Sequence, residues 1–332
     1  MMFHRRGLFG LAGTAVLARS THAQAPDYPT RPVRIIVGFP PGGASDILGR
    51  AVAQELTKAL AQPGHTSGQP FVVENRGGAN SLIATQELIR AAPDGHTLMM
   101  THASYVTNAL FYPGHPYDPA RDATGIATVA RSPFVLLANP SLGARSMAEL
   151  IRMAKAKPGG INYASPGMGS MQHLSHALLD SQADIRLTHV PYNGGGPALN
   201  DLIAGHVSLM FSTTVQAAPF IQGGQLIPIA VSSARRLPIL PEVPAIAETV
   251  PGFESDLWHG IIGPKGIPER TVARLNEVVG RIVGSPEMRA RLAAQGTEPF
   301  LTTPAEFAAL LASETEKWAR VLREAGVSAN PT

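Results

Sequence analysis

The chain has 332 residues, of which 44% are hydrophobic and 15% charged, a balance typical of about two globular domains and not of a disordered chain. It has no cysteine, which excludes disulfide bonds, thiolate nucleophiles, iron–sulfur clusters and cysteine-ligated zinc. Of the 27 basic residues three lie in residues 1–25, which hold no acid, so the remaining 24 balance 24 acidic residues. The basic isoelectric point therefore gives no support to nucleic-acid binding.

Residues 1–25 predict a signal peptide. Arg5 and Arg6 precede an apolar run over residues 8–18, and Ala23-Gln24-Ala25 offers small residues for cleavage. The apolar run is too short to cross a bilayer, and a buried first helix is the alternative. Adjacent arginines also permit the twin-arginine route, so we expect export by the general secretory or the twin-arginine pathway.

A buried strand over Val33–Val37 is the first predicted element after the leader. A Pro-Pro-Gly-Gly turn follows at residues 40–43, then a helix from Asp46 to Leu60 with one apolar face. A glycine-rich turn between strand and helix directs unpaired N–H groups and the positive end of the helix dipole at one point. This geometry suits a carboxylate or another small anion. The alternative is a tight turn in which Ser45 or Asp46 caps the helix.

Strands and helices continue to alternate along the chain. A strand at Phe71–Asn75, a helix at Ser81–Ala92 and a strand at Thr97–Thr101 complete a βαβαβ series, which favours a mostly parallel sheet covered by helices on both faces. A second series starts near Ala127, and helices predominate after Pro268. We therefore expect an α/β protein with two lobes, the first made of residues 26–126 and 255–332 and the second of residues 127–254.

A second glycine-rich turn lies in the second series, at residues 165–170. Gly167 and Gly169 allow close backbone approach, and Ser165 and Ser170 offer hydroxyl groups just before a helix. The structural alternative is an ordinary strand–turn–helix with Ser170 as N-cap. His173 and His176 follow at a spacing of three, but no third ligand stands nearby in sequence, so we expect no metal site there.

Weaker candidates lie where other strands end. Tyr192 and Gly194 belong to a turn of three glycines that either contacts a ligand or only reverses the chain. Asn80 stands at the start of the second predicted helix. The remaining candidates end or follow strands at the same expected edge of the sheets: Phe39, Thr101, Ala103 and Thr213.

Catalytic patterns are poor. Ser170 lacks the second glycine of a Gly-x-Ser-x-Gly elbow, no lysine accompanies the Pro-Pro-Gly-Gly turn as in a phosphate-binding loop, and no Gly-x-Gly-x-x-Gly opens the first helix. We therefore expect no catalytic residues, no cofactor and no metal. An exported α/β hydrolase that uses a serine of residues 165–170 stays the alternative, because catalytic groups assemble in space.

An ordered set of segments resembles one family, the periplasmic solute-binding proteins of tripartite tricarboxylate transporters, of the TctC or Bug type. The set covers nearly the whole chain after the leader. Its members are Tyr28-Pro29-Thr30-Arg31-Pro32, residues 36–46, Val73-Glu74-Asn75-Arg76, residues 93–98, residues 163–173, residues 189–195, residues 240–244 and Trp258-His259-Gly260.

The resemblance implies a two-lobed periplasmic-binding-protein fold, of the Venus-flytrap kind, that closes over a small carboxylate and delivers it to membrane permease subunits. It implies that the N–H groups of Gly43, Ala44 and Ser45 receive the carboxylate, partly through water, while Asp46 organises the loop. A receptor that reports to a sensor protein is a further alternative. The expected protein is a periplasmic monomer, and the identity of the carboxylate stays open.

Overall fold

The computed structural model describes residues 28–61, 69–111, 114, 117–192, 194–294 and 296–326. The predicted signal peptide, residues 62–68 and Asn193 lie outside the described residues. Within these residues no helix combines the length and apolar composition needed to cross a lipid bilayer.

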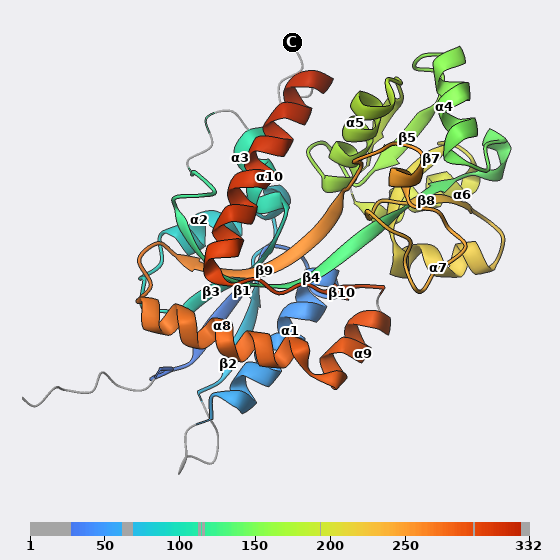
Figure 1. Cartoon of the computed structure of the whole chain (residues 1–332). Helices are drawn as coiled ribbons and strands as arrows, with labels where there is room; N and C mark the ends of the chain where they lie inside the picture. The colour runs from blue at the N-terminus through green and yellow to red at the C-terminus, as the bar shows by residue number, and fades with distance from the viewer. Residues whose placement is uncertain are drawn as a thin grey trace, which may run out of the picture.

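Ten strands of the described chain form one mixed sheet (Figure 1) in the order β2-β1-β3-β9-β4-β7-β5-β6, with β8 and β10 also paired to β4. Their bounds are β1 (Val33–Val37), β2 (Phe71–Asn75), β3 (Thr97–His102), β4 (Ala123–Ala138), β5 (Asn162–Ser165), β6 (Thr188–Pro191), β7 (Leu209–Thr213), β8 (Ile227–Val231), β9 (Asp256–Pro264) and β10 (Glu298–Pro299).

The sheet has two halves that share β4. The first half contains β1, β2, β3, β9, β10 and the beginning of β4; the second contains β5 to β8 and the end of β4. Strand β1 runs parallel to β2 and β3, and β5 runs parallel to β6 and β7. The expectation of mostly parallel pairing does not hold at the centre, where β9 and β4 pair antiparallel with their neighbours. The chain enters the second half on β4 and returns on β9, so these two strands run in opposite directions.

Strand β4 is longer than its predicted strand, which covered only residues 135–138, and it pairs with β9 from Ala123 opposite Pro264 to Pro133 opposite Asp256. The register of this pair shifts twice, between Gly125 and Ala127 and between Thr128 and Ala130. The expected lobe boundary at residues 126/127 falls inside β4, so the division into lobes stays a prediction.

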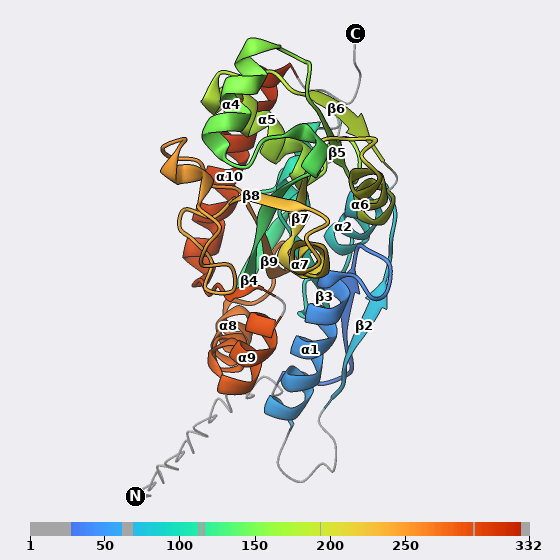
Figure 2. The same cartoon turned by 90° about the vertical axis from the view of Figure 1, so that its right-hand side faces the viewer.

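Helices cover both halves. Their bounds are α1 (Ala44–Ala59), α2 (Leu82–Ile89), α3 (Ser104–Phe111), α4 (Met147–Ala156), α5 (Met171–Ala183), α6 (Gly195–Ala204), α7 (Thr214–Gln222), α8 (Glu269–Gly284), α9 (Pro286–Ala294) and α10 (Pro304–Ala325), with 3-10 turns η1 (Ala79–Ser81), η2 (Pro140–Leu142) and η3 (Ile246–Glu248). Figure 2 shows α4 and α5 at one end of the molecule and α1, α8 and α9 at the other. Helix α10 packs against both α3 and α5, so it contacts elements of both halves. Helix α3 was not predicted.

The apolar core forms three clusters. One joins β1 to α1 and α8 through residues such as Val37, Leu56 and Val279. Another lies in the second half between the sheet and α6 and α7. The largest joins α3, α5 and α10 across both halves and includes Trp258 and Trp318, both almost fully buried. Apolar burial therefore stabilises the contact between the halves as well as each half.

Candidate functional site

The turn between β1 and α1 leaves three backbone donors unused. Gly43 is the N-cap of α1 in extended conformation, and no side chain caps the helix. The N–H groups of Gly43, Ala44 and Ser45 have no acceptor among the described residues. Helix α1 has 16 residues, so its dipole adds positive potential at this point. The turn therefore presents neutral donors of the kind that bind anions at helix N-termini.

Asp46 holds this turn in place. Its carboxylate accepts hydrogen bonds from the Gly42 N–H at 2.9 Å and the Asn75 amide at 2.9 Å, and it forms an ion pair with Arg50 at 2.9 Å. Asp46 is buried. Burial alone would raise its pKa, but the bonds from Arg50, Gly42 and Asn75 together lower that pKa below the ordinary value. Since its oxygens are occupied, Asp46 organises the turn.

Aromatic rings stack next to this turn. Phe39 stacks on His102 with ring centroids 4.5 Å apart, and His102 meets His259 edge-on at 5.8 Å. Burial lowers the pKa of His102 well below its usual value, so this ring is neutral. The candidates Thr101 and Ala103 flank His102 and are buried.

Asn80 lies in a left-handed segment before α2. Ala79, Asn80 and Ser81 have φ values of +46°, +51° and +78°, which cost conformational energy in residues other than glycine. Two hydrogen bonds join this segment to α3, from the Asn80 amide to Asn108 Oδ1 at 2.9 Å and from the Asn108 amide to Asn80 O at 2.7 Å. Helix α2 is shorter than the predicted helix at residues 81–92: the left-handed segment delays its start to Leu82, and it ends at Ile89.

In the turn at residues 165–170 the glycine N–H groups already have hydrogen-bond acceptors nearby. The Gly167 N–H donates to Ser165 Oγ at 3.1 Å, and the Gly169 N–H to His173 Nδ1 at 3.1 Å. Ser170 caps α5, because its Oγ accepts the His173 N–H at 3.3 Å. The N–H groups left without an acceptor among the described residues are those of Met168, Met171 and Gln172, none of which was predicted.

A stack of histidine rings with Tyr163, called the histidine stack below, contacts this turn. His189 on β6 is 2.6 Å from Ser165 Oγ and stacks on His173 with centroids 4.0 Å apart. Tyr163 stacks on His189 at 4.9 Å and on His176 at 3.8 Å. Burial lowers the pKa of His189 to about 4 and that of His173 to about 3, so both are neutral near pH 7. No local spacing predicted His189; only the pairing of β5 with β6, which sets Tyr163 opposite His189, brings it here.

Rings stacked face to face direct their nitrogen lone pairs sideways and not at a common point. In agreement with this, no three His, Asp or Glu side chains of the described residues come together as ligands for a metal ion.

The third turn is tied to the second. The Tyr192 N–H donates to Ser165 O at 3.0 Å, and the Gly194 N–H to Pro166 O at 3.0 Å. The Tyr192 hydroxyl donates to Asp201 at 2.6 Å. Thr213, the N-cap of α7, donates from its hydroxyl to Gln216 Oε1 at 3.2 Å. These candidates therefore surround the carboxyl ends of β5, β6 and β7.

Helix α3 connects the two groups of candidates. It starts directly after Ala103, carries Asn108 against Asn80, and ends at Phe111. A Cβ built on Gly169 would lie 2.9 Å from the Phe111 ring, so the second turn packs against the end of α3. Each half thus presents its candidates at the carboxyl ends of parallel strands, where ligands of open α/β sheets bind.

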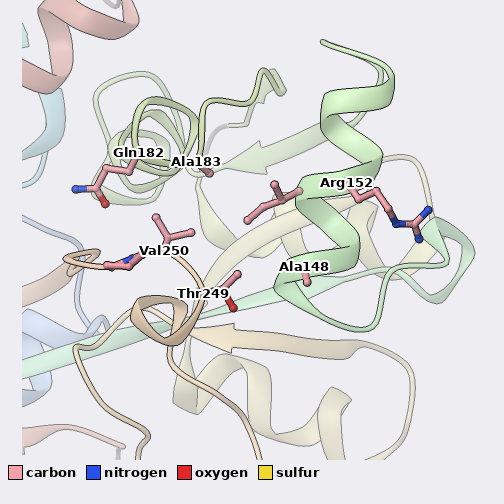
Figure 3. Close-up of a pocket in the computed structure, with 8 residues that line it drawn as sticks. Ala148, Arg152, Gln182, Ala183, Thr249 and Val250 are labelled. Atoms are coloured by element: carbon pink, nitrogen blue, oxygen red, sulfur yellow. The ribbon is translucent and has the colours of Figure 1, made fainter.

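A separate hollow of about 470 Å³ lies between α4, α5 and the segment after η3 (Figure 3). It is lined mostly by apolar side chains, and none of the candidate residues contributes to it. Arg152 and Gln182 extend from it in opposite directions. We therefore place the candidate site at the turns and not here.

Comparison with known proteins gives consistent matches. The family model of the tripartite tricarboxylate transporter family receptor matches residues 48–327. A UPF0065 protein in the tcbD-tcbE intergenic region of Pseudomonas sp. (strain P51) is 36% identical, over 98% of this chain and 96% of that protein. The structure of Rpa4515 from R. palustris with adipate has a TM-score of 0.79 at 34% identity, covering 91% of this chain and 99% of that one. MatC (Rpa3494) from Rhodopseudomonas palustris with bound malate has a TM-score of 0.75 at 32% identity, covering 89% and 100%.

Proposed function

This chain belongs to the tripartite tricarboxylate transporter receptor family, and we propose that it is a periplasmic receptor that captures a small carboxylate between its two halves. The receptor delivers this ligand to the permease subunits of a tripartite tricarboxylate-type transporter. The bound adipate and malate of the two related structures support a carboxylate ligand. The leader predicted at residues 1–25 supplies the export signal.

The observation that carries the proposal is the set of free N–H groups on Gly43, Ala44 and Ser45. Three neutral donors at a helix N-terminus hold a carboxylate without a cation, and water bridges share in the contact. The free donors of Met168, Met171 and Gln172 face the ligand from the second half. A ligand that contacts both halves binds the closed arrangement more tightly and so shifts the equilibrium towards it.

Ala44 allows one donor to be removed with little effect on the fold. It is exposed and is the first residue of α1, where proline is well tolerated, and Gly43 before it already has the extended conformation that proline requires. We expect Ala44→Pro to weaken carboxylate binding roughly tenfold or more, because a hydrogen bond to a charged group is lost. Ala44→Ser keeps the N–H group and is the matched control.

Isothermal titration of the mature protein with a panel of di- and tricarboxylates measures this effect. Equal affinities of Ala44→Pro and the wild type for the same acid would remove the first turn from the site. Binding of neutral solutes but of no carboxylate would overturn the proposed carboxylate ligand.

The hydrolase alternative has one geometric argument, the 2.6 Å contact between Ser165 and His189. Ser165 is completely buried, however, and its hydroxyl also bonds within the turn. We propose that this pair supports the turn and catalyses no reaction. An assay of ester hydrolysis decides, since turnover that Ser165→Ala or Ser170→Ala abolishes would establish the enzyme.

A receptor that reports to a sensor protein would use the same site. The genes beside that of this chain separate the two roles, because a dedicated transporter receptor is expected beside permease genes.

A further inference from the structure

Four exposed hydrophobic side chains of the described residues lie next to the candidate turns: Ile47, which is 38% exposed, and three that are more exposed. Ile83 in the first turn of α2 is 52% exposed, Met168 in the second turn 41%, and Val215 in the first turn of α7 50%. Single exposed apolar residues are ordinary on a protein surface. These three, however, adjoin Asn80, Gly167 and Thr213, which are candidate ligand residues in both halves.

Ile83 is held in place by the left-handed segment. Its Cδ1 covers Gly78, where an added Cβ would come within 2.5 Å, and Gly77 lies against Pro40 of the first turn. The three positive φ values before α2 persist because the Asn80–Asn108 bonds hold them. Strained backbone of this kind clusters at functional sites.

Met168 and Val215 belong to neighbouring segments of the second half, the turn at residues 165–170 and the first turn of α7. Gly195 lies against both Pro166 and Gln216, the neighbour of Val215. Gly169, the neighbour of Met168, packs on Phe111 of α3, the helix that also carries Asn108. The eight residues of α3 thus connect the surroundings of Ile83 to those of Met168.

Charged side chains are nearly absent from these segments. Residues 39–46, 78–83, 101–108, 165–172, 192–196 and 213–216 contain no lysine or arginine, and Asp46 is their one acid. The oxygens of Asp46 are already occupied. These segments themselves therefore offer apolar contact and neutral groups to a ligand, while Arg50 beside the first turn is paired with Asp46.

On the basis of the proposed function, we propose that the ligand is a carboxylate with an apolar carbon body, an unsubstituted aliphatic or aromatic acid. Its carboxylate binds the N–H groups of Gly43, Ala44 and Ser45, and its carbon body contacts Ile83, Met168 and Val215. Hydroxylated acids bind more weakly, because their hydroxyl groups lose water without gaining partners beside these three side chains.

Titration calorimetry with hydroxylated and unsubstituted acids tests the inference. Adipate and galactarate share a six-carbon dicarboxylate chain and differ by four hydroxyl groups; hexanoate and benzoate add apolar monocarboxylates. We expect adipate to bind at least tenfold more tightly than galactarate. If galactarate binds as tightly as adipate or more tightly, the ligand has no apolar carbon body, but the chain is still a carboxylate receptor. If neither these acids nor citrate bind, the proposed function is overturned as well.

Exposed positions allow variants that keep the fold. Val215→Thr and Met168→Gln replace apolar groups with polar ones of similar size, and each is expected to weaken adipate binding about fourfold per buried methyl group lost. Val72→Thr, on edge strand β2 and 48% exposed, is the matched control and leaves the affinity unchanged. If Val215→Thr and Met168→Gln both behave like Val72→Thr, these side chains do not contact the ligand.

Discussion

The two glycine-rich turns share a strand–turn–helix framework but use their backbone donors differently. In the first turn the buried carboxylate of Asp46 accepts the Gly42 N–H, and the next three N–H groups have no acceptor among the described residues. In the second turn hydroxyl and imidazole groups satisfy the N–H groups of Gly167 and Gly169. Similar motifs therefore differ in the atoms available to a ligand, and only the hydrogen bonds reveal this difference.

Removal of Asp46 should have the largest effect on this comparison. Asp46→Ala removes the acceptor of the Gly42 N–H and one of the acceptors of both the Asn75 amide and Arg50, which keep their bonds to Phe39 O and Asn75 Oδ1. We expect a loss of about 3 kcal/mol in the free energy of unfolding. Ser165→Ala in the second turn should cost only about 1 kcal/mol, since it removes neutral hydrogen bonds. Urea denaturation measures both, and equal losses would contradict the different anchoring of the two turns.

A methyl group at Gly169 tests the contact between the second turn and α3. Its φ of +74° disfavours a side chain, and the added Cβ would lie 2.9 Å from Phe111, so Gly169→Ala should cost about 2 kcal/mol. Gly143→Ala is the control: its φ is +79°, but its surroundings are open, so only the backbone cost of about 1 kcal/mol is expected. Thermal unfolding of the two variants compares them, and equal losses would show that Phe111 yields freely.

The third and smallest effect that we expect is a loss of folding stability in acid, caused by protonation of the stacked histidines. The folded pKa values of His173, His176 and His189 lie below the unfolded value near 6.5, so the unfolded chain binds more protons and stability falls as pH drops from about 6.5 towards 4. Burial raises the pKa of Asp180 to about 7, which acts in the opposite direction over a similar range. A substitution within the stack separates the two effects.

His176→Phe is that substitution. Neither ring nitrogen of His176 has a partner among the described residues, and the ring packs on Tyr163 and Phe211. We expect stability at pH 7 to be kept or raised by about 1 kcal/mol, and the loss between pH 6.5 and 5 to shrink by up to about 1.4 kcal/mol per pH unit. An unchanged pH slope in urea titrations would mean that His176 does not resist protonation.

Local patterns predicted the first turn well, because strand, proline–glycine turn and amphipathic helix follow one another within 30 residues. Helix α3 was missed, since its eight residues include β-branched and aromatic side chains of low helix propensity and its packing against α10 supplies the stability. Most of β4 was missed because Arg131, Ser132 and Pro133 interrupt the apolar pattern. Pro133 lies where pairing with β9 ends.

The candidate site was harder to predict than the fold. The residues around both turns were chosen from glycine and hydroxyl content, but the donors that stay free depend on distant partners such as Asn75 and His189. The left-handed run at residues 79–81 depends on Asn108, 28 residues from Asn80, and has no sequence signature of its own. The assignment of each candidate to the ligand stays a prediction.

The antiparallel pair of β4 and β9 limits how one half of the molecule can turn against the other. Sliding the strands past each other would break the whole ladder at once, whereas twisting and bending them together preserves most of its bonds. The ladder is interrupted at the two register shifts, near Gly125 and near Val129, so we expect bending to concentrate there. We therefore expect any rotation of the halves to proceed by twisting of this pair and not by sliding of its strands.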